Sequence, residues 1–441
     1  MSTNLIRAMA LGLALTLVAA CSSSGDDGEG SSGSTPAAPV DYEALGLWDD
    51  GPCDETKPPL VIGLMTVFES GIISLEDQAL ALEAAGDAFN ERGGANGSCI
   101  EVHTCDDGAN ADQSLDCVRE IDDAGVVATI NDQGTQGQAD VSAAMIDAGI
   151  PRVAGLISPD DWAAPNNYAL DGGGTGVAFV IPQALIEAGI TSIGTIRVDF
   201  ASASALNGFL ADIYEGDATF DYDVPVPAGT TDYTQFTLGA QDAGVGGVVL
   251  ALGENEAVQV VRAAQQLNAD IRMGASLGSF PHATVADLGD FAEQGVYVGS
   301  YPPATFDLPV YEALRADLAA SGEESLQPAN LKASPMRSWI GLYALLWMIR
   351  DTGMTEFTRE GITAMLDEAT DVPMLGMFGD DDWTPAFDHE GAIARSGMSR
   401  WASYAWDPDA PAPDGLEGNF VESAVMNFDQ ILCGSPLGAP C

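Results

Sequence analysis

The pentapeptide Gly274-Ala275-Ser276-Leu277-Gly278 is the clearest candidate for covalent chemistry in this chain of 441 residues. It follows a predicted strand and matches the GxSxG pattern, in which hydrolases place a nucleophilic serine on a sharp turn before a helix. A histidine oriented by an aspartate would have to serve as base, and the candidates are His282, His389, Asp381 and Asp388. However, the helix must begin directly after the turn, and Phe280-Pro281 stand there instead. We therefore predict that the protein is not an enzyme.

Two other motifs have a simpler interpretation than the chemistry they suggest. The run Gly172-Gly173-Gly174-Thr175-Gly176 is similar to a nucleotide-binding loop, but it lacks a lysine and follows no buried strand, so we interpret it as a hinge. The run Asp380-Asp381-Asp382 is typical of a solvated acidic turn rather than a calcium site. No cysteines have CxxC spacing and the three histidines are scattered, so we predict neither a metal site nor a cofactor.

The first residues have the pattern of an export signal. Arg7 precedes an apolar run from Ala8 to Ala20, which is too short to span a bilayer as a permanent helix. The run ends in Leu17-Val18-Ala19-Ala20-Cys21, which resembles the lipobox of bacterial lipoproteins. That resemblance implies removal of a signal peptide (residues 1–20) and attachment of a diacylglycerol to the Cys21 thiol. An ordinary secretory signal with a cysteine nearby is the alternative.

Residues 21–57 are predicted to be a flexible tether between this lipid and a folded body. From Ser22 to Val40 nearly all residues are Ser, Gly, Asp, Glu, Pro or Ala, which bury too little apolar surface to offset the entropy of ordering. We therefore expect the body to lie outside the cytoplasm, anchored to the cell membrane. The residues after the tether are too many for one compact core, so we expect two domains.

The charge balance excludes some classes of partner. The chain has 66 acidic and 15 basic residues, a net charge of −51, and its only lysines are Lys57 and Lys332. Such a surface repels phosphate backbones and anionic lipid headgroups, so we predict no nucleic-acid binding. We interpret the charge as a means of solubility rather than as a site for a cationic partner.

Six cysteines remain once Cys21 is assigned to the lipid, and export permits them to form three disulfides. Cys105 and Cys117 flank a short loop and a helix start, so we pair them. Cys433 and Cys441 would close a C-terminal tail of residues 431–441. Cys53 would then pair with Cys99. Sequence alone also permits other pairings.

Predicted strands and helices alternate through the body. Leu60 to Met65 is a short apolar run, and the following helix from Leu75 to Arg92 has Ser74 as its expected N-cap. The pattern repeats as far as Leu156, restarts after Gly174 and continues to Gly299, with a strand expected over Ser192 to Val198 and a helix over Thr284 to Ala292. This alternation predicts an α/β fold with two doubly wound parallel-sheet lobes.

Ligands bind at the carboxyl ends of parallel strands, so two facing sheets would form a cleft lined by loops. The loops in question are residues 66–73, 131–135, 157–162, 199–202, 253–255 and 276–280.

Several short motifs also stand in a fixed order along the body. They include Ile62-Gly63, Phe89-Asn90-Glu91-Arg92-Gly93-Gly94, Cys105-Asp106-Asp107, Gly149-Ile150-Pro151, Thr231-Asp232-Tyr233 and Trp383-Thr384-Pro385-Ala386. No single motif is specific, but together they cover Leu60 to Trp406. In this order they resemble the type 1 periplasmic binding proteins of the branched-chain amino-acid ABC-transporter class. The paired cysteines, the lipobox and the scarcity of lysine are similar to the actinobacterial branch.

The resemblance implies a Venus-flytrap architecture with a three-stranded hinge, crossed near residues 172–175, 300–303 and 373–379. Lobe 1 would comprise residues 58–174 and 301–375, and lobe 2 residues 175–300 and 376–430. It further implies a monomer that closes over a small ligand and docks on the permease subunits of an ABC importer. A ligand must then stabilise the closed state by contacting both lobes.

The resemblance also implies a ligand site built from both lobes. In lobe 1, hydroxyls and backbone N–H groups at helix N-termini would hold a ligand carboxylate. The residues of lobe 1 predicted to bind the ligand are Phe68, Glu69, Ser70, Asp132, Gln133, Thr135, Leu156 and Ser158. Two alternatives stay open, namely that Thr135 and Ser158 are only helix caps and that Phe68 belongs to the core.

Lobe 2 departs from the family pattern. Where a Tyr-Gly pair would contact the ligand, Phe200 keeps the ring without the hydroxyl. The acid that would bind a ligand ammonium is missing from the loop that contains Leu277, and Glu254 is the nearest replacement. Phe200, Glu254 and Leu277 are the predicted contacts of lobe 2.

The ligand predicted from these residues is a branched-chain or hydrophobic amino acid, or a related amide or carboxylate. Because the expected acid is missing, a hydrophobic, amide or carboxylate ligand without an ammonium group is an alternative. A ligand sensor that acts with a separate receptor is the alternative function.

Overall fold

The computed structural model describes residues 40–68, 70, 73–134, 136–155, 164–171, 173–199, 202–227, 229–276, 278–386, 400–413 and 415–427. The predicted signal peptide, Cys21, most of the tether and the pair Cys433–Cys441 lie outside these residues. Among the described residues, no helix is both long and apolar enough to cross a bilayer.

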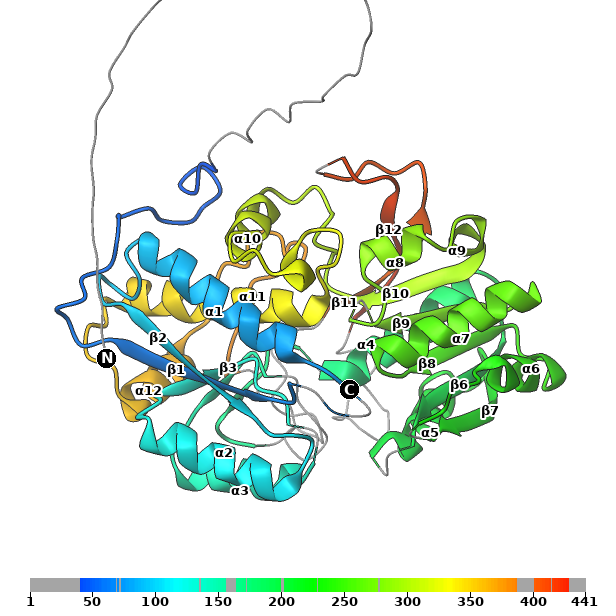
Figure 1. The fold of residues 1–441 in the computed structure, drawn as a ribbon, viewed down its shortest axis with the longest axis horizontal. Helices are drawn as coiled ribbons and strands as arrows, with labels where there is room; N and C mark the ends of the chain where they lie inside the picture. Colours follow the sequence, from blue (N-terminus) through cyan, green and yellow to red (C-terminus); the bar gives the residue numbers. More distant parts are fainter. Residues whose placement is uncertain are drawn as a thin grey trace, which may run out of the picture. The chain divides into compact units, whose positions relative to one another are not determined.

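The first sheet contains five parallel strands in the order β2-β1-β3-β4-β5. Its strands are β1 (Leu60–Thr66), β2 (Ile100–Asp106), β3 (Ala128–Ile130), β4 (Arg152–Val153) and β5 (Asn167–Tyr168). One face is covered by α1 (Glu76–Glu91), α10 (Pro309–Ala319) and α11 (Ala333–Thr352), and the other by α2 (Ala111–Asp123) and α3 (Gln138–Asp147) (Figure 1). The helix α12 (Arg359–Glu368) packs on α11, and a 3-10 turn, η2, spans Glu324–Leu326. We call this sheet with its helices the first lobe.

The second sheet contains seven strands in the order β12-β11-β10-β9-β8-β6-β7. Its parallel strands are β6 (Ser192–Val198), β7 (Thr219–Val226), β8 (Gly247–Ala251), β9 (Arg272–Ser276) and β10 (Val296–Ser300). At one end of the sheet, β11 (Arg400–Asp407) pairs antiparallel with β10, and the edge strand β12 (Asn419–Asn427) pairs antiparallel with β11. The predicted α/β fold with parallel-dominated sheets is therefore confirmed.

Helices cover both faces of the second sheet. On one face α4 (Gly173–Glu187) packs against β8 to β12, next to η1 (Ser202–Ala205) and α5 (Leu206–Ile213). The other face carries α6 (Thr234–Asp242), α7 (Glu254–Leu267), α8 (His282–Ala286) and α9 (Asp290–Gly295) (Figure 1). We call this sheet with its helices the second lobe.

Two local predictions are wrong. Ser74 does not cap α1, because the helix begins after Leu75 and the Ser74 hydroxyl donates instead to the carbonyl of Phe68 at 2.6 Å. The helix expected over Thr284 to Ala292 is divided into α8 and α9, because Gly289 between them has φ of +53°, which a right-handed helix cannot contain.

Two of the three predicted disulfides are confirmed. Cys53–Cys99 ties the segment before β1 to the entry of β2, and Cys105–Cys117 ties the end of β2 to α2. Each bond restricts the unfolded chain more than the folded one and so stabilises the first lobe.

The chain passes between the two sheets at residues 169–171, at residues 301–308 and between α12 and β11. We call the first two segments the first and second connection. The predicted lobe boundaries and hinge positions stay a prediction.

Both connections are bonded to one arginine of α11. The Arg337 guanidinium donates to the Asp171 carboxylate on the first connection and, at 2.6 Å, to the Tyr301 hydroxyl on the second. Tyr301 in turn donates to Asp171. The second terminal nitrogen of Arg337 donates to the carbonyls of Ala154 and Gly155 at 3.0 Å each. Nε donates to Asn131 at 3.3 Å, so all five N–H groups of this buried side chain are bonded.

Arg337 also lies against strained backbone at the ends of two strands. Asn131 after β3 and Ala154 after β4 have φ of +53° and +59°, a left-handed conformation that costs an alanine about 1 kcal/mol. The Asn131 amide donates to Ser334 and Ser338 of α11 at 2.9 Å each. Gly341 allows this close approach, because a Cβ there would lie 2.6 Å from the Cβ of Ala154. Helix α11 thus fixes the loops that follow β3 and β4.

We predict that Arg337→Gln destabilises the protein by about 3–5 kcal/mol, because it leaves the buried Asp171 carboxylate without its counter-charge. The matched control is Arg119→Gln, whose ion pair with Asp116 is exposed and should cost no more than about 0.5 kcal/mol. Chemical denaturation of both variants provides the comparison. Equal stability of the two variants would contradict a central role for Arg337.

Candidate functional site: a cavity between the lobes

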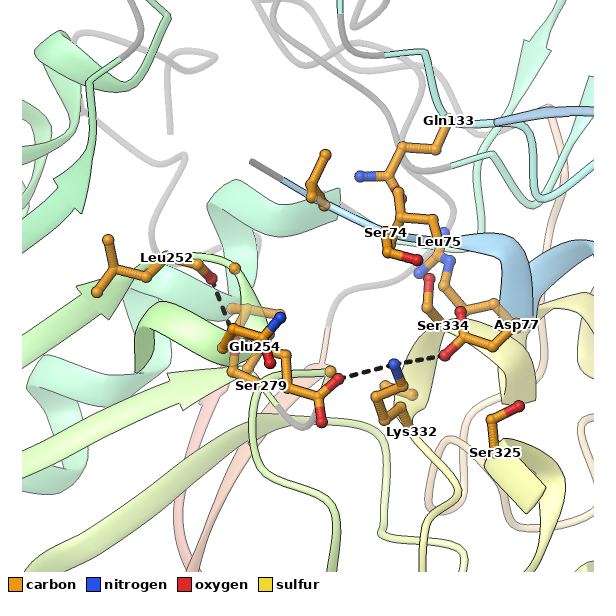
Figure 2. A pocket seen from close by; sticks show the side chains of 18 of the residues that line it. Ser74, Leu75, Asp77, Gln133, Leu252, Glu254, Ser279, Ser325, Lys332 and Ser334 are labelled. Carbon is orange, nitrogen blue, oxygen red and sulfur yellow. Dashed lines mark hydrogen bonds and ion pairs between the residues drawn. The ribbon is translucent and has the colours of Figure 1, made fainter. Parts of the chain in front are cut away.

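A cavity of about 500 Å³ lies between elements of the two lobes. The first lobe and the first connection contribute Ile73, Ser74, Leu75, Glu76, Asp77, Leu80, Gln133, Asp171, Ser325, Lys332, Ala333, Ser334 and Arg337. The second lobe contributes Val177, Leu252, Gly253, Glu254, Asn255, Glu256, Ser276, Gly278, Ser279 and Trp401. Figure 2 shows Leu252, Glu254 and Ser279 on one side and Ser74, Gln133 and Ser334 on the other.

The position of the cavity follows from the parallel sheets. Gln133 stands in the loop that follows β3, Leu252 comes directly after β8, and Ser276 is the last residue of β9. Carboxyl ends of parallel strands meet at one edge of a sheet, where the chain turns into loops and helices. The lining residues are thus consistent with the prediction that loops at the carboxyl ends of the strands form the cleft.

Three long helices begin at this cavity. They are α1, α7 and α11, and none of their N-cap residues makes a side-chain hydrogen bond to the helix. The partial positive charge and free N–H groups of a helix N-terminus favour an oxygen acceptor or an anion. Acidic residues in the first turns of α1 and α7 offset this effect, whereas the first turn of α11 contains none.

Lys332 places its ammonium between carboxylates of the two lobes. Nζ lies 2.5 Å from Asp77 Oδ2 of the first lobe and 2.9 Å from Glu254 Oε2 of the second (Figure 2). The Lys332 side chain is only 15 % exposed. Burial by itself lowers the pKa of Lys332, but Asp77 and Glu254 outweigh burial and raise it above the usual value. The side chain is therefore a permanent cation in the cavity.

Apolar side chains form the rest of the lining. Leu75 and Leu80 come from the first lobe, and Val177, Leu252 and Trp401 from the second. The Trp401 ring is almost fully buried against Gly176, where a Cβ would collide with the ring. A cavity with apolar walls and a few charged and hydroxyl groups is typical of a site for a small organic molecule.

The structure brings two of the predicted ligand residues into the cavity, Gln133 and Glu254. Phe68, Ser70 and Asp132 are not among its lining residues. Phe68 packs against the core, and Ser70 bonds to Ile73 within its own loop. The other predicted residues, Glu69, Thr135, Leu156, Ser158, Phe200 and Leu277, lie outside the described residues.

Asp132 has a structural partner instead. Its carboxylate is fully buried, accepts from Arg152 Nε at 2.7 Å and accepts from the Thr129 hydroxyl at 3.0 Å. A carboxylate paired in this way holds the ends of β3 and β4 together.

Sequence reasoning missed Lys332, Asp77 and Arg337 of the first lobe and Trp401 of the second. Lys332 carried the one usable signal, since it is one of two lysines among 66 acidic residues. Asp77 has the pattern of an ordinary acidic residue in the first turn of a helix. Arg337 stands in an apolar helix, and its bonding partners are distant in sequence, so no local pattern indicates its role.

Residues of the GxSxG motif line the cavity, but among the described residues no histidine is bonded to the Ser276 hydroxyl as a general base would be. The Ser276 hydroxyl lies 3.3 Å from that of Ser279, and α8 begins only at His282, after Pro281. His282 Nε2 lies 2.7 Å from the Gly418 carbonyl, and burial lowers the pKa of this imidazole. Asp388 and His389 lie outside the described residues. In the part of the chain that the structure describes, no cluster of His, Cys, Asp and Glu is suited to hold a metal ion.

Many solved structures match this fold, and the three described next are each 15 % identical to this chain. A fatty acid ABC transporter substrate-binding protein from Thermomonospora curvata has a TM-score of 0.70 and 15 % identity, over 89 % of this chain and 99 % of its own. A leucine-, isoleucine-, valine-, threonine- and alanine-binding protein from Brucella ovis has a TM-score of 0.66 and 15 % identity, over 87 % and 98 %. A solute-binding protein from R. palustris, in complex with 4-hydroxybenzoate, has a TM-score of 0.66 and 15 % identity, over 83 % and 96 %.

Among curated protein sequences, none matches the chain significantly. The sequence profile described as periplasmic binding protein matches residues 59–405, which is most of the chain. This match confirms the resemblance to periplasmic binding proteins, whereas the actinobacterial lipoprotein branch stays a prediction. Members of this family bind solutes rather than transform them. The chain belongs to the periplasmic binding protein family.

Proposed function

We propose that this protein captures a small organic solute in the cavity between its lobes and delivers it to the permease of an ABC importer. The observation that supports this proposal is the lining of the cavity, to which both lobes contribute apolar and charged residues. A solute that contacts both lobes stabilises the arrangement in which they approach each other, which is the state a permease would recognise.

The proposed solute has an apolar body and a polar end. Leu75, Leu80, Val177, Leu252 and Trp401 would contact the apolar part. Lys332 and the N-terminus of α11 would contact an oxygen acceptor. Hydrophobic amino acids and related amides or carboxylates have this form. Similar solved structures are named as binding proteins for leucine, isoleucine, valine, threonine and alanine or for fatty acid, or are in complex with 4-hydroxybenzoate, and these solutes are compatible with that form.

We further propose that Cys21 carries a lipid that anchors the protein at the outer side of the cell membrane. The support is the run of small residues before Cys21 and the polar segment after it. A tethered binding protein stays close to its permease, which raises the effective concentration of the pair.

A thermal-shift screen of the purified protein against hydrophobic amino acids, their amides and small carboxylates tests the binding proposal. We expect at least one of these solutes to raise the melting temperature, because a ligand that binds only the native state stabilises it. Gly278→Leu should weaken binding of that solute at least about tenfold, since the new side chain enters the cavity.

The matched control is Gly208→Leu, on an exposed face of α5 where a Cβ meets no atom within 4 Å. It should bind the solute as the unaltered protein does. Equal affinity in both variants would place the ligand outside this cavity.

Cell fractionation tests the anchor. We expect the unaltered protein in the membrane fraction and Cys21→Ala in the soluble fraction, because alanine offers no thiol for lipid attachment. Ser22→Ala is the control and should stay with the membrane. Membrane retention of Cys21→Ala would refute lipid attachment at this residue.

A further inference from the structure

We propose that Lys332 fills, with its own ammonium, the place that the amino group of a ligand would otherwise occupy. The protein would then select solutes that present an oxygen acceptor and lack an ammonium group. This inference rests on the proposed function and narrows its solute class.

The geometry of Lys332 is that of a bound cation rather than of a surface side chain. Its Nζ contacts one carboxylate from each lobe, at 2.5 Å and 2.9 Å, inside the cavity. An ammonium has three N–H donors, and the two ion pairs leave one for a ligand. Two carboxylates that face one ammonium are acceptors suited to the amino group of a ligand, and here the chain supplies the cation itself.

The surrounding charges support the same assignment. Asp77 is only 6 % exposed, so its carboxylate needs a cation at close range, and Lys332 provides one. The other carboxylate deep in the lining, Asp171, is bonded to Arg337. A ligand ammonium would have to displace Lys332 from Asp77 and Glu254 or lie beside it against Coulomb repulsion.

The oxygen end of a ligand has donors in the same place. Lys332 is the N-cap of α11, and Lys332, Ala333 and Ser334 all line the cavity. The backbone N–H groups of this first helical turn have no acceptor within the helix. The first turn of α11 holds no acidic residue, in contrast to those of α1 and α7. A carboxylate or amide oxygen is therefore favoured beside Lys332.

Chemical rescue tests the proposal without knowledge of the natural solute. Lys332→Ala should lower the melting temperature, and millimolar ethylammonium should restore much of the loss, because the small cation enters the vacant place. Tetramethylammonium, which has no N–H donor, should not. The control is Lys57→Ala. Lys57 is the only other lysine and its ammonium donates to the Asn96 carbonyl outside the cavity, so this variant should show no ethylammonium effect.

The added change Glu254→Gln in Lys332→Ala should weaken the rescue, because it removes one of the two carboxylates. If ethylammonium stabilises Lys332→Ala no more than the unaltered protein, the proposal is wrong. Should Lys332→Ala fail to fold, expression and refolding with and without ethylammonium give the same readout, and Lys332→Gln provides a second, neutral variant.

A pair of solutes with one carbon skeleton tests the selectivity directly. The unaltered protein should bind 4-methylpentanoate at least tenfold more tightly than leucine, and Lys332→Ala should reverse this preference. Tighter binding of leucine by the unaltered protein would overturn the proposal. If neither solute binds, the rescue experiment alone decides, so a failure of the proposed solute class is distinguishable from a failure of the Lys332 assignment.

Discussion

A guanidinium buried in a protein must find an acceptor for each of its N–H groups, because water is not there to replace a missing one. Arg337 finds them where the two lobes are joined, on Asp171 and Tyr301 of the two connections and at the ends of β3 and β4. Burying the ion pair of Arg337 and Asp171 costs free energy of desolvation, which offsets much of the attraction between the two charges. The main effect of these bonds is therefore to fix one conformation. They allow the connections one arrangement relative to α11.

The cavity depends on this arrangement. Helix α11 carries Arg337 in its interior and has Lys332 as its N-cap, so the residue that fixes the connections and the cation of the cavity belong to one rigid element. Asp317 of α10 joins the same helix to the end of α1. Its carboxylate accepts two bonds from Arg92, which follows α1, at 2.8 and 2.7 Å, and one from Trp339 of α11 at 2.8 Å. A shift of α11 would therefore disturb the wall of the cavity and both connections together.

The fold was largely predictable from sequence because local signals agree with the tertiary structure. β6 spans Ser192–Val198 as predicted, and the pairing of Cys53 with Cys99 and of Cys105 with Cys117 was found as well. Of the described residues predicted near the carboxyl ends of strands, Gln133 and Glu254 line the cavity. Asp132 stands in the same loop as Gln133, yet its partner Arg152 lies on a neighbouring strand, and no local pattern shows which of the two side chains enters the cavity.

Whether a charged side chain in a cleft is available to a ligand depends on its contacts in the folded chain, as Lys332 illustrates. In sequence, Glu254 was the nearest replacement for the acid that would bind a ligand ammonium. In the folded chain it lies 2.9 Å from a lysine that is 78 positions away and belongs to the other lobe. The same ion pair that removes Glu254 from the list of free acceptors also joins the lobes across the cavity. A solute that enters must therefore either use this pair or separate it, and the side of the cavity that holds Lys332 determines which chemistry the protein can accept.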